Sequence, residues 1–83
     1  MNTSPADTIA ALNLPASVHT QALKLLDAIS HARTLDETLR AADRAEGFGL
    51  GIETVRALNA SAVEGLYLAF DSASQLRQSE LAD

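Results

Sequence analysis

The sequence predicts an all-α fold, a small antiparallel bundle of three main helices with short helical segments and a glycine-rich corner at residues 47–51. Hydrophobic residues make up 47% of the 83-residue chain, whereas aromatic residues make up only 4%. The apolar residues are mainly Ala and Leu, which are strong helix formers. They also recur every three to four positions, the spacing that places side chains on one face of a helix. A chain of this length is expected to form one domain, 1–83, with a thin core.

The N-terminal part of the chain is expected to form a short helix over residues 5–12. Ser4 is a typical N-cap, and Pro5 and Asp7 are of the types favoured in a first helical turn. Residues 1–4, before this helix, are expected to be disordered.

A second helix is predicted over residues 15–32, where the amphipathic pattern is clearest. Pro15 suits its first turn, because a proline there removes no helical hydrogen bond. At about 100° per residue, seven apolar residues fall on one side: Leu14, Val18, Ala22, Leu25, Leu26, Ile29 and Ala32.

A third helix over residues 35–46 begins at a capping box formed by Thr34 and Glu37. Its apolar stripe fades at Glu46, and residues 47–51 then read Gly-Phe-Gly-Leu-Gly. Because each glycine costs roughly 1 kcal/mol in a helix interior, the three glycines indicate a turn or a strong kink. The alternative is an uninterrupted helix in which the glycines admit a close neighbour.

Two further helical segments are expected after this corner. Residues 52–59 form the first and shorter segment. Ser61 and Glu64 repeat the capping-box spacing, which predicts a last helix over residues 61–81. The core side of this last helix combines Val63, Leu66, Tyr67, Phe70, Ala73 and Leu81.

Charge and cysteine content narrow the classes of function. Eleven Asp and Glu residues against six Lys and Arg give a net charge of −5, and cysteine is absent. Nucleic acids and anionic membranes attract clustered Lys and Arg, so the acidic balance argues against a general binder of either. The lack of cysteine fits a reducing cytoplasm. No secretory signal and no segment long enough to cross a membrane is expected.

The chain lacks the residue patterns typical of catalytic, cofactor or metal sites. His19 and His31 fall on different faces of one helix, so they cannot form a metal-binding pair one turn apart. Glu64 and Asp71 lie on the polar side of the last helix, where solvated carboxylates are expected. The glycines at 47–51 have neither the preceding strand nor the following lysine of a phosphate-binding loop. We therefore expect no enzyme activity, no metal and no cofactor.

Residues 38–59 resemble the general helix-turn-helix pattern, two helices joined by a short turn that often contains glycine. Gly49 would lie in the turn, and Arg56 and Asn59 on the second helix would be the candidate DNA contacts. Glu53 on the same helix would repel phosphate. A DNA-binding transcriptional regulator is therefore the alternative function.

The leading hypothesis is a protein–protein interaction module. Leu23, Leu68 and Leu76 fall outside the main apolar stripes of their helices, and with Tyr67 they form the candidate interface. A second buried surface would supplement the thin core of one chain, so we expect a homodimer, with a further protein partner possible. Small acidic helical proteins of this kind are common in bacteria and phages, so we expect a self-associating regulator or adaptor from such a source.

Overall fold

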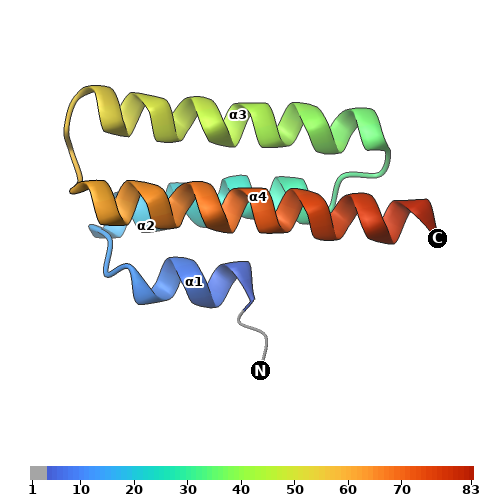
Figure 1. Ribbon diagram of the computed structural model, residues 1–83, viewed down its shortest axis with the longest axis horizontal. Helices are drawn as coiled ribbons and strands as arrows, with labels where there is room; N and C mark the ends of the chain where they lie inside the picture. The colour runs from blue at the N-terminus through green and yellow to red at the C-terminus, as the bar shows by residue number, and fades with distance from the viewer. Residues whose placement is uncertain (1–3) are drawn as a thin grey trace.

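The computed structural model describes residues 4–83 and confirms the all-helical bundle (Figure 1). No strand occurs among these residues. The four helices are α1 (Pro5–Ala11), α2 (Ala16–Ser30), α3 (Leu35–Thr54) and α4 (Ala60–Ala82). Helix α4 lies centrally, with α3 antiparallel to it, α2 behind it and α1 along its first half (Figure 1). No helix in the described part of the chain is long and apolar enough to cross a membrane.

The start of α1 agrees with its predicted cap. The backbone N–H of Asp7 donates to Oγ of Ser4 at 3.1 Å, and Pro5 occupies the first turn. Ser4 is therefore an ordered N-cap rather than part of a disordered end. The expected disorder of residues 1–3 lies outside the described residues.

The glycine-rich corner predicted at residues 47–51 is wrong. Helix α3 passes through all five residues and ends at Thr54. The separate short helix predicted over residues 52–59 is also wrong, because the chain turns between Thr54 and Ala60. Most of the stability of a helix in a protein comes from packing of its apolar face, and α3 packs against both α2 and α4. This packing outweighs the local preference of the glycines for a turn.

The three glycines of α3 lie in different surroundings. Gly47 and Gly51 are exposed, and a Cβ at either position would meet nothing within 4 Å. Gly49 is buried, and a Cβ there would stand 2.7 Å from Cε1 of Tyr67. The uninterrupted helix with a close neighbour, which was the sequence-based alternative, is the observed arrangement.

Helix α3 ends in a Schellman motif that contains no glycine. The N–H of Arg56 donates to the carbonyl of Glu53 at 3.1 Å, and the N–H of Ala57 donates to that of Ile52 at 3.1 Å. This pattern requires a left-handed residue just after the helix. Arg56 takes that conformation, with φ of 54°.

The structure confirms the predicted N-cap of α3 but not that of α4. The N–H of Glu37 donates to Oγ1 of Thr34 at 3.0 Å, which confirms the predicted cap of α3. The Glu37 carboxylate accepts from the N–H of Arg33 at 2.9 Å. For α4 the prediction is wrong: Asn59 is the N-cap, its Oδ1 accepting from Ala62 N–H at 2.8 Å, and Ser61 lies inside the helix.

The core lies where the four helices meet. Its largest fully buried side chains are Ile9 from α1, Ile29 from α2 and Leu66 from α4. The predicted stripe of α2 supplies Ala22, Leu25, Leu26 and Ile29, and α4 adds Ala69, Phe70 and Ala73. The buried hydroxyl of Thr38 donates to the carbonyl of Thr34 at 2.8 Å, so this polar side chain enters the core with its hydrogen bond made.

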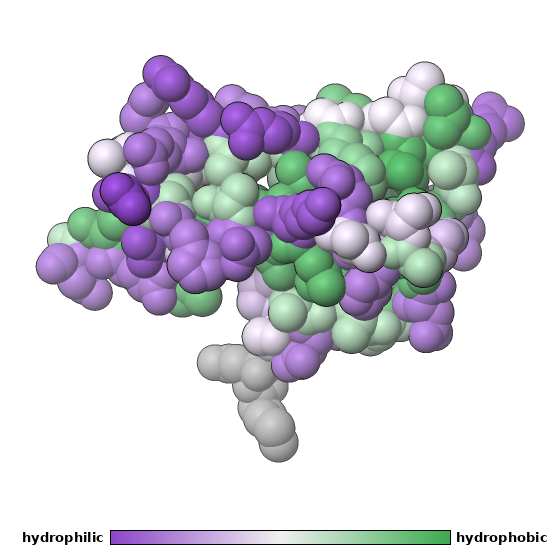
Figure 2. Space-filling view, turned by 180° about the vertical axis from the view of Figure 1, so that it is seen from behind, coloured by the Kyte–Doolittle hydropathy of each residue, from purple (hydrophilic) through white to green (hydrophobic). Residues whose placement is uncertain are grey.

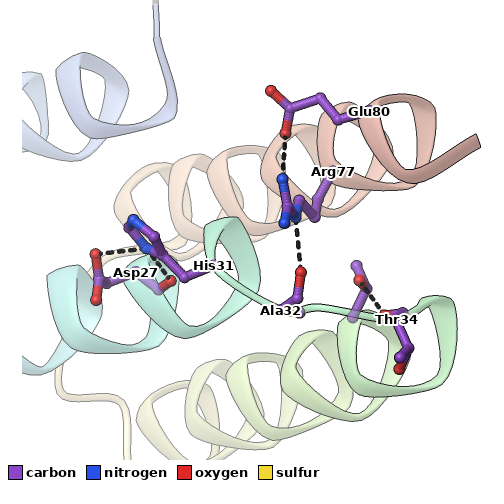
Figure 3. Close-up of polar contacts among 7 residues, drawn as sticks. Asp27, His31, Ala32, Thr34, Arg77 and Glu80 are labelled. Carbon is purple, nitrogen blue, oxygen red and sulfur yellow. Dashed lines mark hydrogen bonds and ion pairs between the residues drawn. The ribbon is translucent and has the colours of Figure 1, made fainter. Parts of the chain in front are cut away.

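Arg77 of α4 fixes the connection between α2 and α3 (Figure 3). Its Nε donates to the carbonyl of Ala32 at 2.8 Å, and its Nη1 lies 3.3 Å from Oε1 of Glu80. Close by, Nδ1 of His31 lies 3.0 Å from both the backbone oxygen and Oδ1 of Asp27. The guanidinium thus satisfies a carbonyl just beyond the end of α2.

Candidate functional site

A groove with a volume of about 430 Å³ lies between α3 and α4. Four residues of each helix line it: Ala42, Glu46, Leu50 and Glu53 from α3, and Tyr67, Phe70, Asp71 and Ser74 from α4.

Helical spacing and the antiparallel pairing of α3 with α4 bring these residues together. On each helix the lining residues are separated by one, three or four positions, so they share one face. Because the two helices run in opposite directions, the end of α3 lies beside the beginning of α4 (Figure 1). Glu53 therefore reaches Tyr67, although fourteen positions separate them in the sequence.

The groove has an apolar base and an exposed apolar rim. Phe70 belongs to the core cluster and is 3% exposed, and Ala42 packs against the same cluster. Leu50 is 49% exposed on the α3 side. Leu50 therefore adds exposed apolar surface to the edge of the groove.

The apolar side of the groove continues along α3 towards its N-terminus. Leu35 and Leu39 lie eleven and seven positions before Glu46, which places all three within about 20° of one direction around the helix. Leu35 is 54% and Leu39 is 45% exposed. We call Leu35, Leu39, Ala42, Glu46, Leu50 and Glu53 the outer stripe of α3.

The charged residues of the groove all have the same sign. Of the eight lining residues, Glu46, Glu53 and Asp71 are acidic and none is Lys or Arg. Oε1 of Glu53 accepts a hydrogen bond from the Tyr67 hydroxyl at 3.3 Å, and Oδ2 of Asp71 accepts one from Nε2 of Gln75 at 3.0 Å. The groove is therefore apolar at its base and negatively charged at its edges.

The surroundings of Tyr67 in the groove raise the pKa of its hydroxyl. Partial burial raises the pKa of the Tyr67 hydroxyl above its ordinary value of 10.0, because the phenolate would lose hydration. The negative charge of Glu53, its hydrogen bond with the hydroxyl, and the charge of Glu46 raise the pKa further.

No family model, curated protein or solved structure matches this chain. What the groove can bind is therefore inferred from its own residues.

The four residues of the predicted interface lie at different places. Tyr67 lines the groove. Leu68 and Leu76 are exposed on α4, at 59% and 55%. Leu23 is half-buried on α2 and packs against the core cluster. The structure thus brings only Tyr67 of this set into the groove.

The helix-turn-helix predicted for residues 38–59 is wrong. Its proposed turn lies inside α3, so Gly49 joins no pair of helices. Arg56 lies in the connection after α3, and the side chain of Asn59 caps α4. Arg56 and Asn59 therefore both lie between α3 and α4, and not on a helix over residues 52–59.

The groove residues Glu46, Leu50, Glu53 and Phe70 were not recognised as a site from the sequence. The sequence feature that points to this site is the outer stripe of α3, whose helical spacing continues from Leu35 through the glycines to Glu53. The corner predicted at residues 47–51 divides this stripe between two predicted helices, so the stripe is not apparent as one continuous face.

A second, more polar hollow lies between α2 and α3. Its lining includes Asp27, His31, Glu37, Arg40 and Arg44. Viewed from the side of α2, hydrophilic residues gather over the half with the α2–α3 connection, and hydrophobic residues are frequent over the other half (Figure 2). No group of three or more acidic or histidine side chains that could hold a metal ion occurs within residues 4–83. The lack of enzyme activity stays a prediction from the sequence.

Proposed function

We propose that this chain is a protein–protein interaction module that binds a helical segment of a partner in the α3–α4 groove. The observation that carries the proposal is the outer stripe of α3: its three leucines, Leu35, Leu39 and Leu50, are each about half exposed, and Leu50 lines the groove. In helix-in-groove recognition, an amphipathic helix of the partner lays its apolar face against such apolar surface.

The dimensions of the outer stripe suit a helical partner. From Leu35 to Glu53 the stripe covers eighteen positions, a length of about 27 Å at 1.5 Å per residue. A helix of about five turns could lie along it and contact α3 and α4 together. Such a helix would cover the exposed leucines that the chain alone leaves in water.

Within this proposal the chain acts as a small regulator or adaptor. We extend the proposal to the cytoplasm as the compartment and to a bacterium or phage as the source. Both rest on the composition of the sequence, which contains no cysteine.

Site-specific photo-crosslinking tests the proposed function. A photoreactive phenylalanine analogue replaces Leu50 in one version of the chain and Gln21, an exposed residue of α2, in the other. Irradiation in the source cells is expected to give a defined protein adduct from position 50 and none from position 21. The same adducts from both positions, or none from position 50, would refute a groove-specific interaction.

Self-association is a second candidate, supported by a separate observation. Leu68 and Leu76 of α4 remain more than half exposed, outside the groove. A symmetric dimer that buried them would supplement the thin core of one chain. Sedimentation equilibrium tests this: a dimer should be lost in the Leu68→Gln, Leu76→Gln variant. A particle of 8.7 kDa at high protein concentration would refute the dimer.

A further inference from the structure

Resting on the proposed function, we propose that the groove's partner is a cationic amphipathic helix. Its apolar side would contact the groove base and the leucines of α3, and its Lys or Arg side chains would meet the groove carboxylates. Charge complementarity determines this choice of partner.

The groove carboxylates are arranged on both edges. Glu46 and Glu53 lie on α3 seven positions apart, which is two helical turns and about 10 Å along the axis. Asp71 lies opposite, on α4. A partner with basic residues two turns apart on one flank, and one on the other flank, would place a cation near each carboxylate.

Within residues 4–83, no cationic side chain forms an ion pair with these three carboxylates. The ion pairs among the described residues are His31 with Asp27, Arg40 with Asp36, and Arg77 with Glu80. Arg40 and Arg44 of α3 line the other hollow, between α2 and α3. That hollow is also lined by Asp27 and Glu37, so it contains charges of both signs, whereas the charged residues of the groove are all acidic.

Charge also argues against other occupants. A second copy of this chain would bring a net charge of −5 and the same three carboxylates to the groove. Like charges brought together at an interface are unfavourable and suppress the wrong partner. An acidic or a neutral helix would leave Glu46, Glu53 and Asp71 partly desolvated without a compensating cation.

The single tyrosine provides a direct probe of binding. Tyr67 lines the groove, and the chain contains no other tyrosine and no tryptophan. The test uses three synthetic peptides of 18 residues without aromatic side chains. One has Leu at helical spacing with Lys elsewhere, the second has Glu in place of Lys, and the third has the composition of the first in an order without amphipathic spacing. Only the first is expected to change the Tyr67 fluorescence saturably, with an affinity that falls as salt increases.

Two variants of equal net charge locate the binding. The groove variant is Glu46→Gln, Glu53→Gln, Asp71→Asn, and the matched control is Asp7→Asn, Asp27→Asn, Asp83→Asn. All six carboxylates are exposed, so both variants should keep the helical circular dichroism of the parent. We expect the groove variant to weaken binding of the Leu/Lys peptide by about tenfold, and the control by less than about twofold.

The outcomes separate this inference from the proposed function. Equal weakening by both variants would mean general attraction to an acidic protein and would overturn the inference. Equal binding of the Leu/Glu peptide, or no binding of the Leu/Lys peptide, would also overturn it. If position 50 still gives its specific crosslink, the interaction module stands and only the cationic partner is wrong. Loss of that crosslink would refute the module itself.

Discussion

The ring of Tyr67 lies against the backbone of Gly49, so closely that a Cβ on the glycine would stand 2.7 Å from Cε1 of the ring. Cζ and Cδ1 of the ring would lie at 3.2 and 3.3 Å from the same position. This contact lets α3 approach α4 at the end of the groove, where the Tyr67 hydroxyl reaches Glu53. Glycine is needed there for space, because its backbone is helical and not left-handed.

Gly49→Val is expected to destabilise the protein by about 1–3 kcal/mol, the usual cost of inserting methyl groups into a packed site. Denaturant unfolding followed by circular dichroism measures the change. Gly47→Ala is the control, and it should gain about 0.5–1 kcal/mol because the position is helical and open. In a Tyr67→Ala background the Gly49→Val penalty should shrink. An unchanged midpoint for Gly49→Val would contradict the observed packing.

Arg56→Gly is expected to stabilise the protein by about 1 kcal/mol, because a residue other than glycine in the left-handed conformation is strained. Arg56 has φ of 54° just after α3. The free energy of unfolding should rise, while Arg56→Ala, which keeps a Cβ, should leave it nearly unchanged. A loss of stability in the glycine variant would mean that Arg56 has an interaction that offsets its backbone strain.

Arg77→Met is expected to cost about 1–3 kcal/mol, because it leaves the carbonyl of Ala32 without its charged donor. Methionine keeps most of the aliphatic packing of the arginine stem. Glu80→Gln is the control: it weakens an exposed ion pair but leaves the Ala32 bond in place, so it should change stability by less than about 0.5 kcal/mol. Equal effects of the two substitutions would show that the Ala32 bond contributes little.

Asn59→Ala is expected to destabilise the protein by about 1 kcal/mol, because the side chain caps α4. Ser61→Ala should have an effect smaller than about 0.5 kcal/mol, since Ser61 lies inside the helix at an exposed position. Thermal unfolding of the two variants compares the positions directly. The reverse order of effects would restore Ser61 as the cap.

Tyr67 is expected to titrate above pH 10.0, which ultraviolet absorbance can follow without interference because it is the only tyrosine. In the unfolded chain its pKa should return to the ordinary value. Since folding favours the protonated hydroxyl, this contribution to stability is complete below pH 10.0 and is lost as the pH rises through the folded-state pKa. Glu53→Gln should lower the folded-state pKa, whereas Glu80→Gln should not. An unshifted Tyr67 in the parent would contradict the contact with Glu53.

Much of the fold can be predicted from interactions between residues that are close in the sequence. The spacing of Ala22, Leu25, Leu26 and Ile29 placed the buried side of α2, and short-range side chain to backbone bonds placed the caps at Ser4 and Thr34. These features involve residues within one or two turns of each other. Contacts between residues so close in the sequence can be predicted from residue spacing alone.

The groove could not be predicted in the same way, because its two edges come from helices that meet only in the folded chain. The sequence predicts Tyr67 as an interface residue, and the structure places it in the groove. The sequence does not indicate its neighbours on α3, because the glycines at residues 47–51 favour a corner there. Leu23, Leu68 and Leu76 are predicted at the interface because they fall outside the main apolar stripes of their helices. The structure places Leu23 against the core and leaves Leu68 and Leu76 exposed away from the groove.

The sequence by itself determined the helical class, the amphipathic face of α2, the cap of α3 and the excess of negative charge. Only the tertiary structure decided that α3 continues to Thr54 and that Gly49 admits a ring from α4. Three glycines cost about 3 kcal/mol in a helix interior. The helical hydrogen bonds that continue through residues 47–51, and the packing of the partly buried Phe48 against the core cluster, offset this cost. The partners that supply this burial lie on α2 and α4, far away in the sequence.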